Sequence, residues 1–336
     1  MSSSLSSSSS PSSVYSTEPY CIGYLGPAFT NSHNAALRLL ELLTLPSEHI
    51  TLQAFASLPL LLEACEQHRV HAIVAPYENA LEGTVIDTLD ALANQARGMI
   101  VHAEWTLPIL HGLIGTLPDL DPSRIHTVYS HPMALGQCRQ TLRQLFGTGV
   151  HLVPTLSTTE AVDQLLALPL PQQHQSVAIA PPRTAERYQL PCYRSNVSDI
   201  TENETRFLLM THHKQALPVG LASLPATLPV KSSLCVKLPE YPGVLKEYLS
   251  VFHRYWVNLT KIESRPTRGK IGEYRFFFEC EGNLHTLAEG KLYQELKARS
   301  RYFHAQAPIV LLDALHATPP SADASLTAVQ PMLGYD

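Results

Sequence analysis

The sequence lacks the motifs that would mark a metal protein, a redox protein or a membrane protein. No apolar stretch approaches the ~20 residues that span a bilayer. The sixteen histidines include no HExxH motif, and their one adjacent pair is His212 and His213. No glycine-rich nucleotide motif is present either. The cysteines are too far apart to form a CxxC motif: Cys21, Cys65, Cys138, Cys192, Cys235 and Cys280. We therefore expect no metal and no cofactor.

An excess of positive charge is also missing. The formal net charge is -5, so the sequence has no excess of basic residues that would bind nucleic acid or an anionic membrane. We expect neither as a partner. With 45% hydrophobic and 16% charged residues, the composition is that of a globular protein, and 336 residues suggest two or three domains. Scattered cysteines without a signal peptide indicate reduced thiols and a cytoplasmic location.

The two ends of the sequence are poor in residues that can form a core. Residues 1–19 are rich in serine, and residues 315–336 are small and polar with several prolines. Such compositions bury too little apolar surface to offset the entropy of ordering. We expect both ends to be disordered.

Between residues 20 and 212, short apolar runs alternate with helical patterns. Residues 21–25 and 71–75 read as buried strands, and residues 84–95 read as a helix. This alternation predicts parallel sheets covered by helices. The fold class we expect is α/β, with a two-lobed domain of the type II periplasmic-binding-protein kind and a cleft between its lobes. One lobe would comprise residues 20–105 and 196–212, and the other residues 106–195.

A second, smaller unit follows a proline-containing linker at residues 213–231. The order predicted for residues 232–314 is βαββαβ, a ferredoxin-like sandwich. The expected elements are a strand at 232–238, a helix that begins with Pro242, strands at 257–264 and 273–280, a helix at 285–299 and a strand at 308–314.

Polar residues occupy four places where a strand ends or a helix begins: residues 26–33, 76–84, 129–138 and 203–207. Each can be explained as a helix cap, a turn or a sheet edge. Each also offers groups that hold a small anion, such as hydroxyls beside a helix N-terminus. Because four such segments occur at equivalent strand ends of a two-lobed α/β unit, together they favour a binding site.

The stretch "NETRF" at residues 203–207 places a hydroxyl, a guanidinium and a phenyl ring side by side. Arg206 offers a planar fork for a carboxylate, and Thr205 offers a proton donor. Alternation along a strand puts Thr205 and Phe207 on one face and Arg206 on the other. Two interpretations of Arg206 stay open: a clamp on a substrate carboxylate, or a structural group behind the site.

These stretches resemble a known family. "YLGPAFTNSH", "APYENALEGTV", "YSHPMALGQC" and "NETRF", in this order, are similar to the prephenate dehydratases. The resemblance implies that Thr205 is the general acid and that Arg206 assists it. It implies substrate-binding roles for Thr30, Ser32, Glu78, Asn79, Ser130, Gln137 and Phe207. Prephenate would be the substrate, and its decarboxylating dehydration to phenylpyruvate needs no cofactor.

The second unit, with "PGVL" at 242–245 and "NLTKIESRP" at 258–266, resembles the phenylalanine-binding ACT domain. The resemblance implies phenylalanine as an allosteric effector, bound where two copies meet in a homodimer or homotetramer. The implied effector-binding residues are Gly243, Val244, Leu245, Asn258, Glu263, Ser264 and Arg265.

Three alternative functions remain open at this point. Arogenate differs from prephenate by an amino group in place of a keto group, and no residue excludes it. A prephenate decarboxylase that does not aromatise its product would have no use for the Thr205 proton. A catalytically silent amino-acid sensor would keep both lobes for binding alone.

Overall fold

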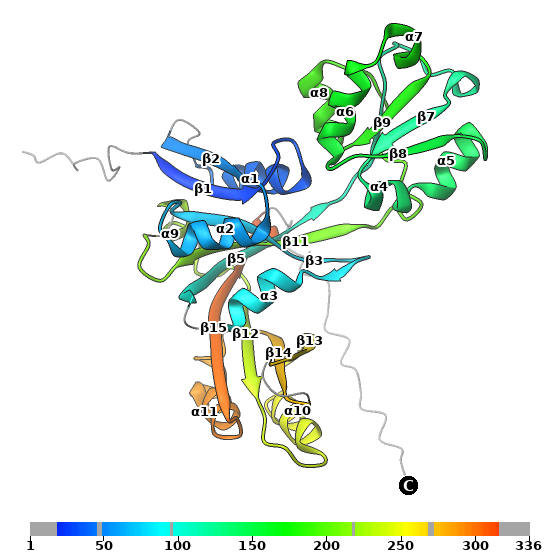
Figure 1. Cartoon of the computed structure of the whole chain (residues 1–336). Coiled ribbons are helices and arrows are strands. Elements are labelled where there is room, and N and C mark those ends of the chain that lie inside the picture. Colours follow the sequence, from blue (N-terminus) through cyan, green and yellow to red (C-terminus); the bar gives the residue numbers. More distant parts are fainter. Residues whose placement is uncertain (1–18, 46–48, 95–96, 217–218, 268–271, 316–336) are drawn as a thin grey trace, which may run out of the picture.

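The structure of the protein is a computed structural model that describes residues 19–45, 49–94, 97–216, 219–267 and 272–315. The two ends predicted to be disordered lie outside the described residues, apart from Pro19 and Leu315. The described strands form two sheets, one of ten strands and one of five (Figure 1). In the described part of the chain, no helix has the length and apolarity needed to cross a bilayer.

The first lobe is built on the larger sheet. Its first elements are β1 (Tyr20–Leu25), α1 (Asn31–Leu42), β2 (Ile50–Phe55), α2 (Leu58–Glu66), β3 (Ala72–Asn79), β4 (Gly83–Thr84), α3 (Ile86–Ala93) and β5 (Met99–Pro108). The chain then leaves for the second lobe and returns as β11 (Glu204–His212), which lies antiparallel between β3 and β5. Two crossing segments therefore connect the lobes, and β11 begins at that crossing.

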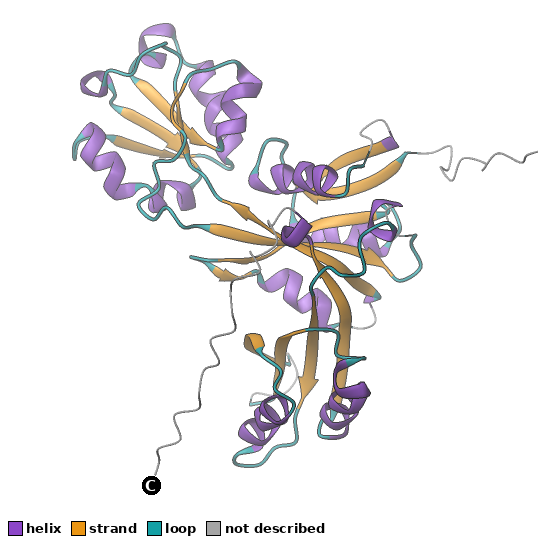
Figure 2. Cartoon of the chain, turned by 180° about the vertical axis from the view of Figure 1, so that it is seen from behind, coloured by secondary structure: helices purple, strands orange, loops and turns teal. Residues whose placement is uncertain are grey.

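The second lobe contains the five-stranded sheet, in the order β10-β6-β9-β7-β8. Its strands are β6 (Gly112–Ile114), β7 (Thr127–Ser130), β8 (His151–Pro154), β9 (Ser176–Ala180) and β10 (Cys192–Arg194). Its helices are η3 (Pro122–Arg124), α4 (Pro132–Gln137), α5 (Arg139–Phe146), α6 (Thr158–Ala167), α7 (Leu170–Gln173) and α8 (Pro182–Tyr188). Figure 2 shows this lobe at one end of the molecule and the C-terminal part at the other.

The C-terminal part follows α9 (Val219–Ala222) and has the order βαββαβ. Its elements are β12 (Val230–Lys237), α10 (Val244–Arg254), β13 (Leu259–Pro266), β14 (Tyr274–Glu281), η4 (Leu287–Gly290), α11 (Lys291–Ala298), β15 (Tyr302–Leu311) and η5 (Leu312–Leu315). We call residues 230–315 the C-terminal unit. Strand β15 pairs in parallel with β5, so the strands of this unit continue the sheet of the first lobe.

One hydrophobic core joins the C-terminal unit to the first lobe. Cys235, Phe277 and Ile309 from the unit are buried in the same cluster as Leu89 and Leu92 of α3. The opposite face of the unit's sheet packs against α10 and α11 through a separate cluster. Removal of these apolar side chains from water stabilises the contact between the unit and the lobe. The shared core therefore fixes the C-terminal unit against β3, β5 and β11, the strands that reach the crossing between the lobes.

The predicted α/β class, with two lobes and a C-terminal βαββαβ order, is confirmed. Some boundaries differ from the prediction. Thr84 was expected to begin a helix but forms β4 with Gly83, because Asn79 Oδ1 accepts hydrogen bonds from the Leu81 and Glu82 N–H groups and so turns the chain back on β3. Helix α10 begins at Val244 instead of Pro242, because Gly243 has a φ of 88°, outside the helical region.

Candidate active site

A cavity of about 400 Å³ lies between the two lobes at the crossing. Both lobes supply its walls: the ends of β3 and β11 and the start of α1 from the first lobe, and α4 and the start of α6 from the second. Its polar lining residues are Asn31, Ser32, Asn79, Glu82, Thr84, His111, His131, Gln137, Thr158, Asn203 and Thr205. The cavity can therefore hold a small polar molecule in contact with both lobes.

The Thr205 hydroxyl is oriented by Asn79. Asn79 and Thr205 are register partners on β3 and β11, and the Asn79 amide donates to Thr205 Oγ1 at 2.9 Å. The same amide donates to Asn203 Oδ1 at 2.8 Å and to the Glu204 carbonyl at 3.1 Å. The Thr205 hydroxyl accepts this N–H group, and no described contact uses its own proton, so that proton is available to a molecule in the cavity.

Gln137 connects the second lobe to the first across the cavity. Its side-chain oxygen accepts from His111 Nε2 at 2.8 Å and from Asn203 Nδ2 at 3.3 Å. Its amide nitrogen donates to Glu82 Oε1 at 3.0 Å. The amide oxygen and the amide nitrogen of Gln137 are thus both hydrogen-bonded, which fixes the orientation of the side chain. The two lobes meet in a defined hydrogen-bond network next to Thr205.

His111 is the most enclosed titratable group of this network. Burial lowers its pKa from the ordinary value, with the Gln137 hydrogen bond acting in the opposite direction. Its Nε2–H is used by Gln137, and its Nδ1 is buried without a hydrogen-bond partner among the described residues. The lowered pKa favours the neutral imidazole of His111, and its enclosed Nδ1 is an acceptor without a partner among the described residues.

The cavity carries no lysine or arginine among the described residues that line it, and its one carboxylate is Glu82. Anionic groups of a ligand would have to rely on hydroxyls, amides and backbone N–H groups. The start of helix α1 supplies such donors, since its first residues Asn31 and Ser32 line the cavity with an amide, a hydroxyl and backbone N–H groups. Phe207 supplies an apolar wall. Its ring stacks on that of Trp105, with 6.2 Å between the ring centroids.

The predicted site residues divide into two groups. Ser32, Asn79, Gln137, Thr205 and Phe207 line the cavity. The other predicted residues, Thr30, Glu78, Ser130 and Arg206, do not line it.

Thr30 and Ser130 have structural partners. Thr30 caps α1 and donates to the Pro27 carbonyl at 2.9 Å. Ser130 is fully buried and donates to the Ile179 carbonyl at 2.7 Å. For these two hydroxyls the ordinary explanation, a cap and a buried structural bond, accounts for their contacts.

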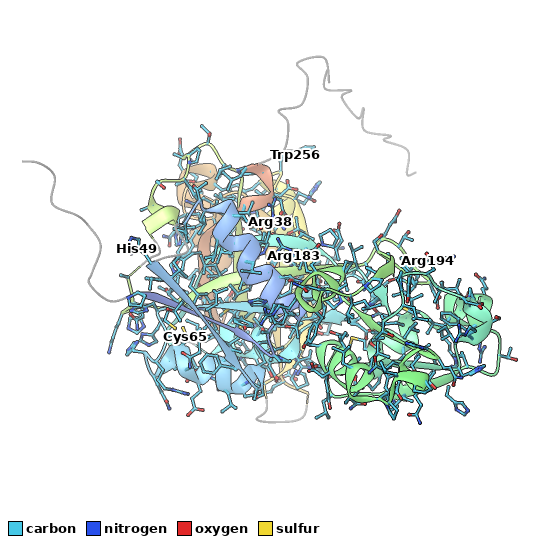
Figure 3. The ribbon with its side chains drawn as sticks, turned by 90° about the horizontal axis from the view of Figure 1, so that it is seen from above. Arg38, His49, Cys65, Arg183, Arg194 and Trp256 are labelled. Atoms are coloured by element: carbon cyan, nitrogen blue, oxygen red, sulfur yellow. The ribbon has the colours of Figure 1, made fainter. Side chains whose placement is uncertain are left out.

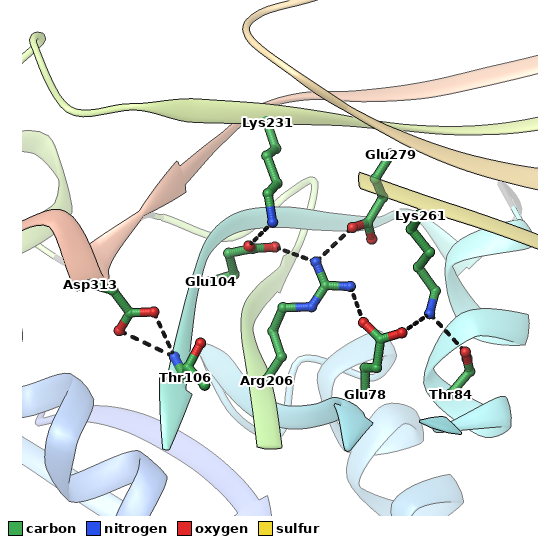
Figure 4. Close-up of polar contacts among 9 residues, drawn as sticks. All are labelled: Glu78, Thr84, Glu104, Thr106, Arg206, Lys231, Lys261, Glu279 and Asp313. Atoms are coloured by element: carbon green, nitrogen blue, oxygen red, sulfur yellow. Dashed lines mark hydrogen bonds and ion pairs between the residues drawn. The ribbon is translucent and has the colours of Figure 1, made fainter. Parts of the chain in front are cut away.

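Arg206 does not line the cavity, and its guanidinium lies among a group of carboxylates (Figure 4). Its guanidinium contacts Glu78 at 2.7 Å, Glu104 at 3.1 Å and Glu279 at 2.6 Å. Burial opposes its charged form, but Glu279 and Glu104 more than compensate and raise the pKa of Arg206 above the ordinary value. Of the two interpretations left open by the sequence, these contacts match a structural group behind the site.

Glu78 belongs to the same group of charged side chains as Arg206. Burial alone would raise its pKa, but Lys261 and Arg206 hold the pKa of Glu78 below the ordinary value. Lys261 Nζ binds Glu78 Oε1 and also donates to Thr84 Oγ1 at 2.7 Å. Glu78 is therefore an ionised partner of two cations on the face of the sheet opposite the cavity.

The predicted effector residues are divided between the two ends of β13. The register of β13 with β14 runs from Leu259 opposite Cys280 to Pro266 opposite Tyr274. Asn258 lies at the first end and donates to Glu281 Oε1 at 3.0 Å. Residues 243–245 lie at the other end, where Val244 and Tyr274 line a second cavity of about 390 Å³.

Two of the remaining effector residues contact the first lobe. Glu263 accepts from Thr84 Oγ1 at 3.0 Å, and Arg265 pairs with Asp90 at 3.7 Å. Neither Glu263, Ser264 nor Arg265 lines the 390 Å³ cavity. Within one chain, the predicted effector residues thus do not form a single site.

Sequence reasoning missed Asn203, His111 and Glu82. Asn203 opens the "NETRF" stretch and could have been included, because its amide adjoins the proposed acid. His111 stands alone between apolar residues, and only the folded chain brings it to Gln137. No group of three or more potential metal-ligating side chains is found within the described ranges.

The helix α1 face also carries an interlobe ion pair outside the cavity. Arg183 of α8 lies beside Arg38 (Figure 3), and Glu41 bridges the two at 3.2 Å and 3.0 Å. Thr159 Oγ1 and Thr184 Oγ1 of the second lobe donate to the Ala28 and Phe29 carbonyls. These contacts hold the second lobe against the start of α1.

Comparison with known proteins gives a consistent result. The family model described as prephenate dehydratase matches residues 22–215. The prephenate dehydratase of Amycolatopsis methanolica is 32% identical over 83% of this chain and 84% of that protein. A structure of the prephenate dehydratase from Arthrobacter aurescens in complex with L-Phe has a TM-score of 0.70 at 26% identity, covering 87% of this chain and 90% of that one. GqqA, described as a quorum quenching acylase, has a TM-score of 0.69 over 86% of this chain and 97% of that one, and its 22% identity shows a shared fold alone.

Proposed function

The chain belongs to the prephenate dehydratase family, and we propose that it converts prephenate to phenylpyruvate, carbon dioxide and water. The observation that carries this proposal is the Asn79–Thr205 pair in the wall of the interlobe cavity, where the Thr205 proton is free for a bound molecule. The leaving group is hydroxide, which departs poorly unless it is protonated. General-acid assistance of this kind contributes ~10²–10⁴-fold.

The reaction consumes one proton and needs no other co-reactant. The C–O bond to the ring hydroxyl breaks as the oxygen takes the proton of Thr205 and leaves as water. The C–C bond to the ring carboxylate breaks, its electron pair completes the aromatic ring, and carbon dioxide leaves. Thr205 then regains a proton from solvent. The free energy gained on aromatisation lies in the substrate, so the protein has to align the dianion and supply one proton.

Incubation of the full chain with prephenate tests the proposal, with the absorbance of phenylpyruvate in base as the measurement. Formation of phenylpyruvate at a rate proportional to protein concentration is expected. Arogenate, offered in parallel, would give phenylalanine directly and identify an arogenate dehydratase. Release of carbon dioxide without the phenylpyruvate absorbance would identify a decarboxylase, and binding without turnover would identify a silent sensor.

The proposed regulation places phenylalanine on the C-terminal unit, as an ACT domain, in a homodimer. Its support is the βαββαβ order, the "PGVL" and "NLTKIESRP" stretches, and the L-Phe complex of the Arthrobacter aurescens relative. Strand β13 is the edge of the sheet, with Ile262 exposed. Antiparallel pairing of two β13 edges would place Asn258 of one copy beside residues 243–245 of the other and complete the effector site.

We also propose a cytoplasmic location for the protein. All six cysteines are unpaired, which suits the reducing cytoplasm.

A homotetramer, formed by two such dimers, is the alternative assembly. Sedimentation with and without phenylalanine distinguishes a monomer, a dimer and a tetramer.

A further inference from the structure

A buried ion network crosses the junction between the first lobe and the C-terminal unit (Figure 4). The first lobe supplies Arg206, Glu78 and Glu104, and the C-terminal unit supplies Lys231, Lys261 and Glu279. Each side alone is unbalanced: the lobe has one cation against two carboxylates, and the unit has two cations against one carboxylate. Together the three cations and three carboxylates are neutral.

The network is enclosed, so its balance matters. The side chains of Lys261, Glu279 and Arg206 are 6%, 5% and 13% exposed, whereas Glu78 at the margin is 36% exposed. Buried charges lose their hydration, and removal of one partner leaves the remaining charge uncompensated. Glu78 and Arg206 pair with each other, and the C-terminal unit adds one further partner to each, Lys261 to Glu78 and Glu279 to Arg206.

These two residues are the immediate neighbours of Asn79 and Thr205. Arg206 is the register partner of Glu78, and Thr205 is the register partner of Asn79. Successive side chains of a strand face opposite sides of the sheet. Glu78 and Arg206 thus face the junction while Asn79 and Thr205 face the cavity, and a shift of either strand at the junction moves the hydrogen bond of 2.9 Å in the cavity.

The strand that carries Lys261 also carries three of the predicted effector residues, Glu263, Ser264 and Arg265. Every second residue of β13 from 261 to 265 contacts the first lobe: Lys261, Glu263 and Arg265. Thr84 joins the first two, since its hydroxyl accepts from Lys261 at 2.7 Å and bonds Glu263 at 3.0 Å. A displacement of β13 therefore reaches Glu78 through a direct contact.

We propose that Lys261, from the C-terminal unit, is a positioning residue for the dehydration, which acts through Glu78 on the Asn79–Thr205 pair. The proposal rests on the proposed function. It extends that function by naming the contact through which phenylalanine on β13 alters turnover. An effect transmitted between two sites requires an element whose position both sites influence, and β13 with Glu78 meets this requirement.

The experiment compares the full-length wild type with Lys261→Met, Lys261→Arg and the control Lys291→Met. Lys291 is an exposed lysine of the same unit that pairs only with Glu289 in the described contacts. Turnover of prephenate is measured with and without saturating phenylalanine, and phenylalanine binding is measured separately by equilibrium dialysis.

For Lys261→Met we expect kcat to fall about tenfold with KM within about twofold, and inhibition by phenylalanine to fall below about twofold while its binding persists. Lys261→Arg should retain most of the wild-type kcat and most of the inhibition by phenylalanine, because it keeps the charge. Lys291→Met equals the wild type. On a Glu78→Gln background, Lys261→Met adds no further loss, since residues that act through one contact are non-additive.

Wild-type kcat and wild-type inhibition in Lys261→Met would overturn the proposal, as would additive losses in the double variant or an equal loss in Lys291→Met. If Lys261→Met does not fold, Glu279→Gln, which weakens the hold on Arg206, is measured with the same expected and contrary results. A wild type that does not turn over prephenate contradicts the proposed function itself, and the role of Lys261 falls with it. An active wild type with an unaltered Lys261→Met contradicts this inference alone.

Discussion

Asn79 and Thr205 face each other across β3 and β11, and the Asn79 amide holds the Thr205 hydroxyl oxygen at 2.9 Å in the wall of the interlobe cavity. The pair joins two strands that are distant in the sequence, since Asn79 and Thr205 are 126 positions apart. The amide fixes the rotamer of the hydroxyl and leaves its proton unused. The following predictions depend on this geometry and on the network behind it.

Removal of the Thr205 hydroxyl should abolish most of the turnover while the fold persists. For Thr205→Val, which keeps the shape of the side chain, we expect kcat for prephenate to fall by about 10²–10⁴-fold. Thr205→Ser keeps the proton donor and should retain a turnover within about tenfold of the wild type. Steady-state kinetics at matched melting temperatures checks both. Turnover of Thr205→Val at the wild-type rate would remove this residue from the mechanism.

Asn79 has two functions that substitution can separate. Its oxygen accepts from the Leu81 and Glu82 N–H groups in the turn, and its amide donates to Thr205. Asn79→Asp keeps the acceptor of the turn but replaces the donor by a carboxylate, which accepts the Thr205 proton itself. We expect near-normal stability and a kcat lowered by at least about 10²-fold. Asn79→Ala should lose both stability and turnover, so thermal melting of the two variants distinguishes the functions.

Substitution of Arg206 should affect stability more than substrate affinity. Arg206→Met leaves Glu78, Glu104 and Glu279 without their shared cation, and breaking a buried pair costs about 3–5 kcal/mol. Denaturant unfolding measures this loss. A raised KM with an unchanged free energy of unfolding would instead indicate an arginine that binds substrate.

The free energy of unfolding should fall in mild acid because of His102. Burial lowers the pKa of His102 to about 4, and its Nε2 bonds the Thr211 hydroxyl at 2.7 Å. An unfolded histidine has a pKa of about 6.5, so between these two values the unfolded state binds more protons than the folded state. The stabilisation is complete above about pH 6.5 and decreases by up to about 1.4 kcal/mol per pH unit as the pH falls toward 4.

Denaturant unfolding at about pH 7.5 and about pH 5 measures this dependence in the wild type and in His102→Gln. The glutamine can still bond Thr211 but does not titrate, so the slope with pH should become shallower. His151→Gln, at an exposed histidine, serves as the control and should leave the slope unchanged. Identical slopes for all three proteins would contradict the role of His102.

Much of the site could be predicted because its residues stand where strands end. The apolar runs at 21–25 and 71–75 define strands, and the polar residues that follow them reach the cavity through Ser32 and Asn79. The helix expected at 84–95 begins later, since the turn at Asn79 decides where the chain reverses. The register of a hairpin depends on such local hydrogen bonds, which periodicity does not report.

The alternation of the strand at residues 205–207 determined by itself that Arg206 would face away from Thr205 and Phe207. Only the tertiary structure decided what Arg206 meets there, because Glu104 and Glu279 lie 102 and 73 residues away along the chain. In the same way, only folding brings His111 to Gln137, because the two residues are 26 positions apart along the chain. Periodicity is a property of neighbours in sequence, whereas the partners of a buried charge are chosen by how the sheets pack.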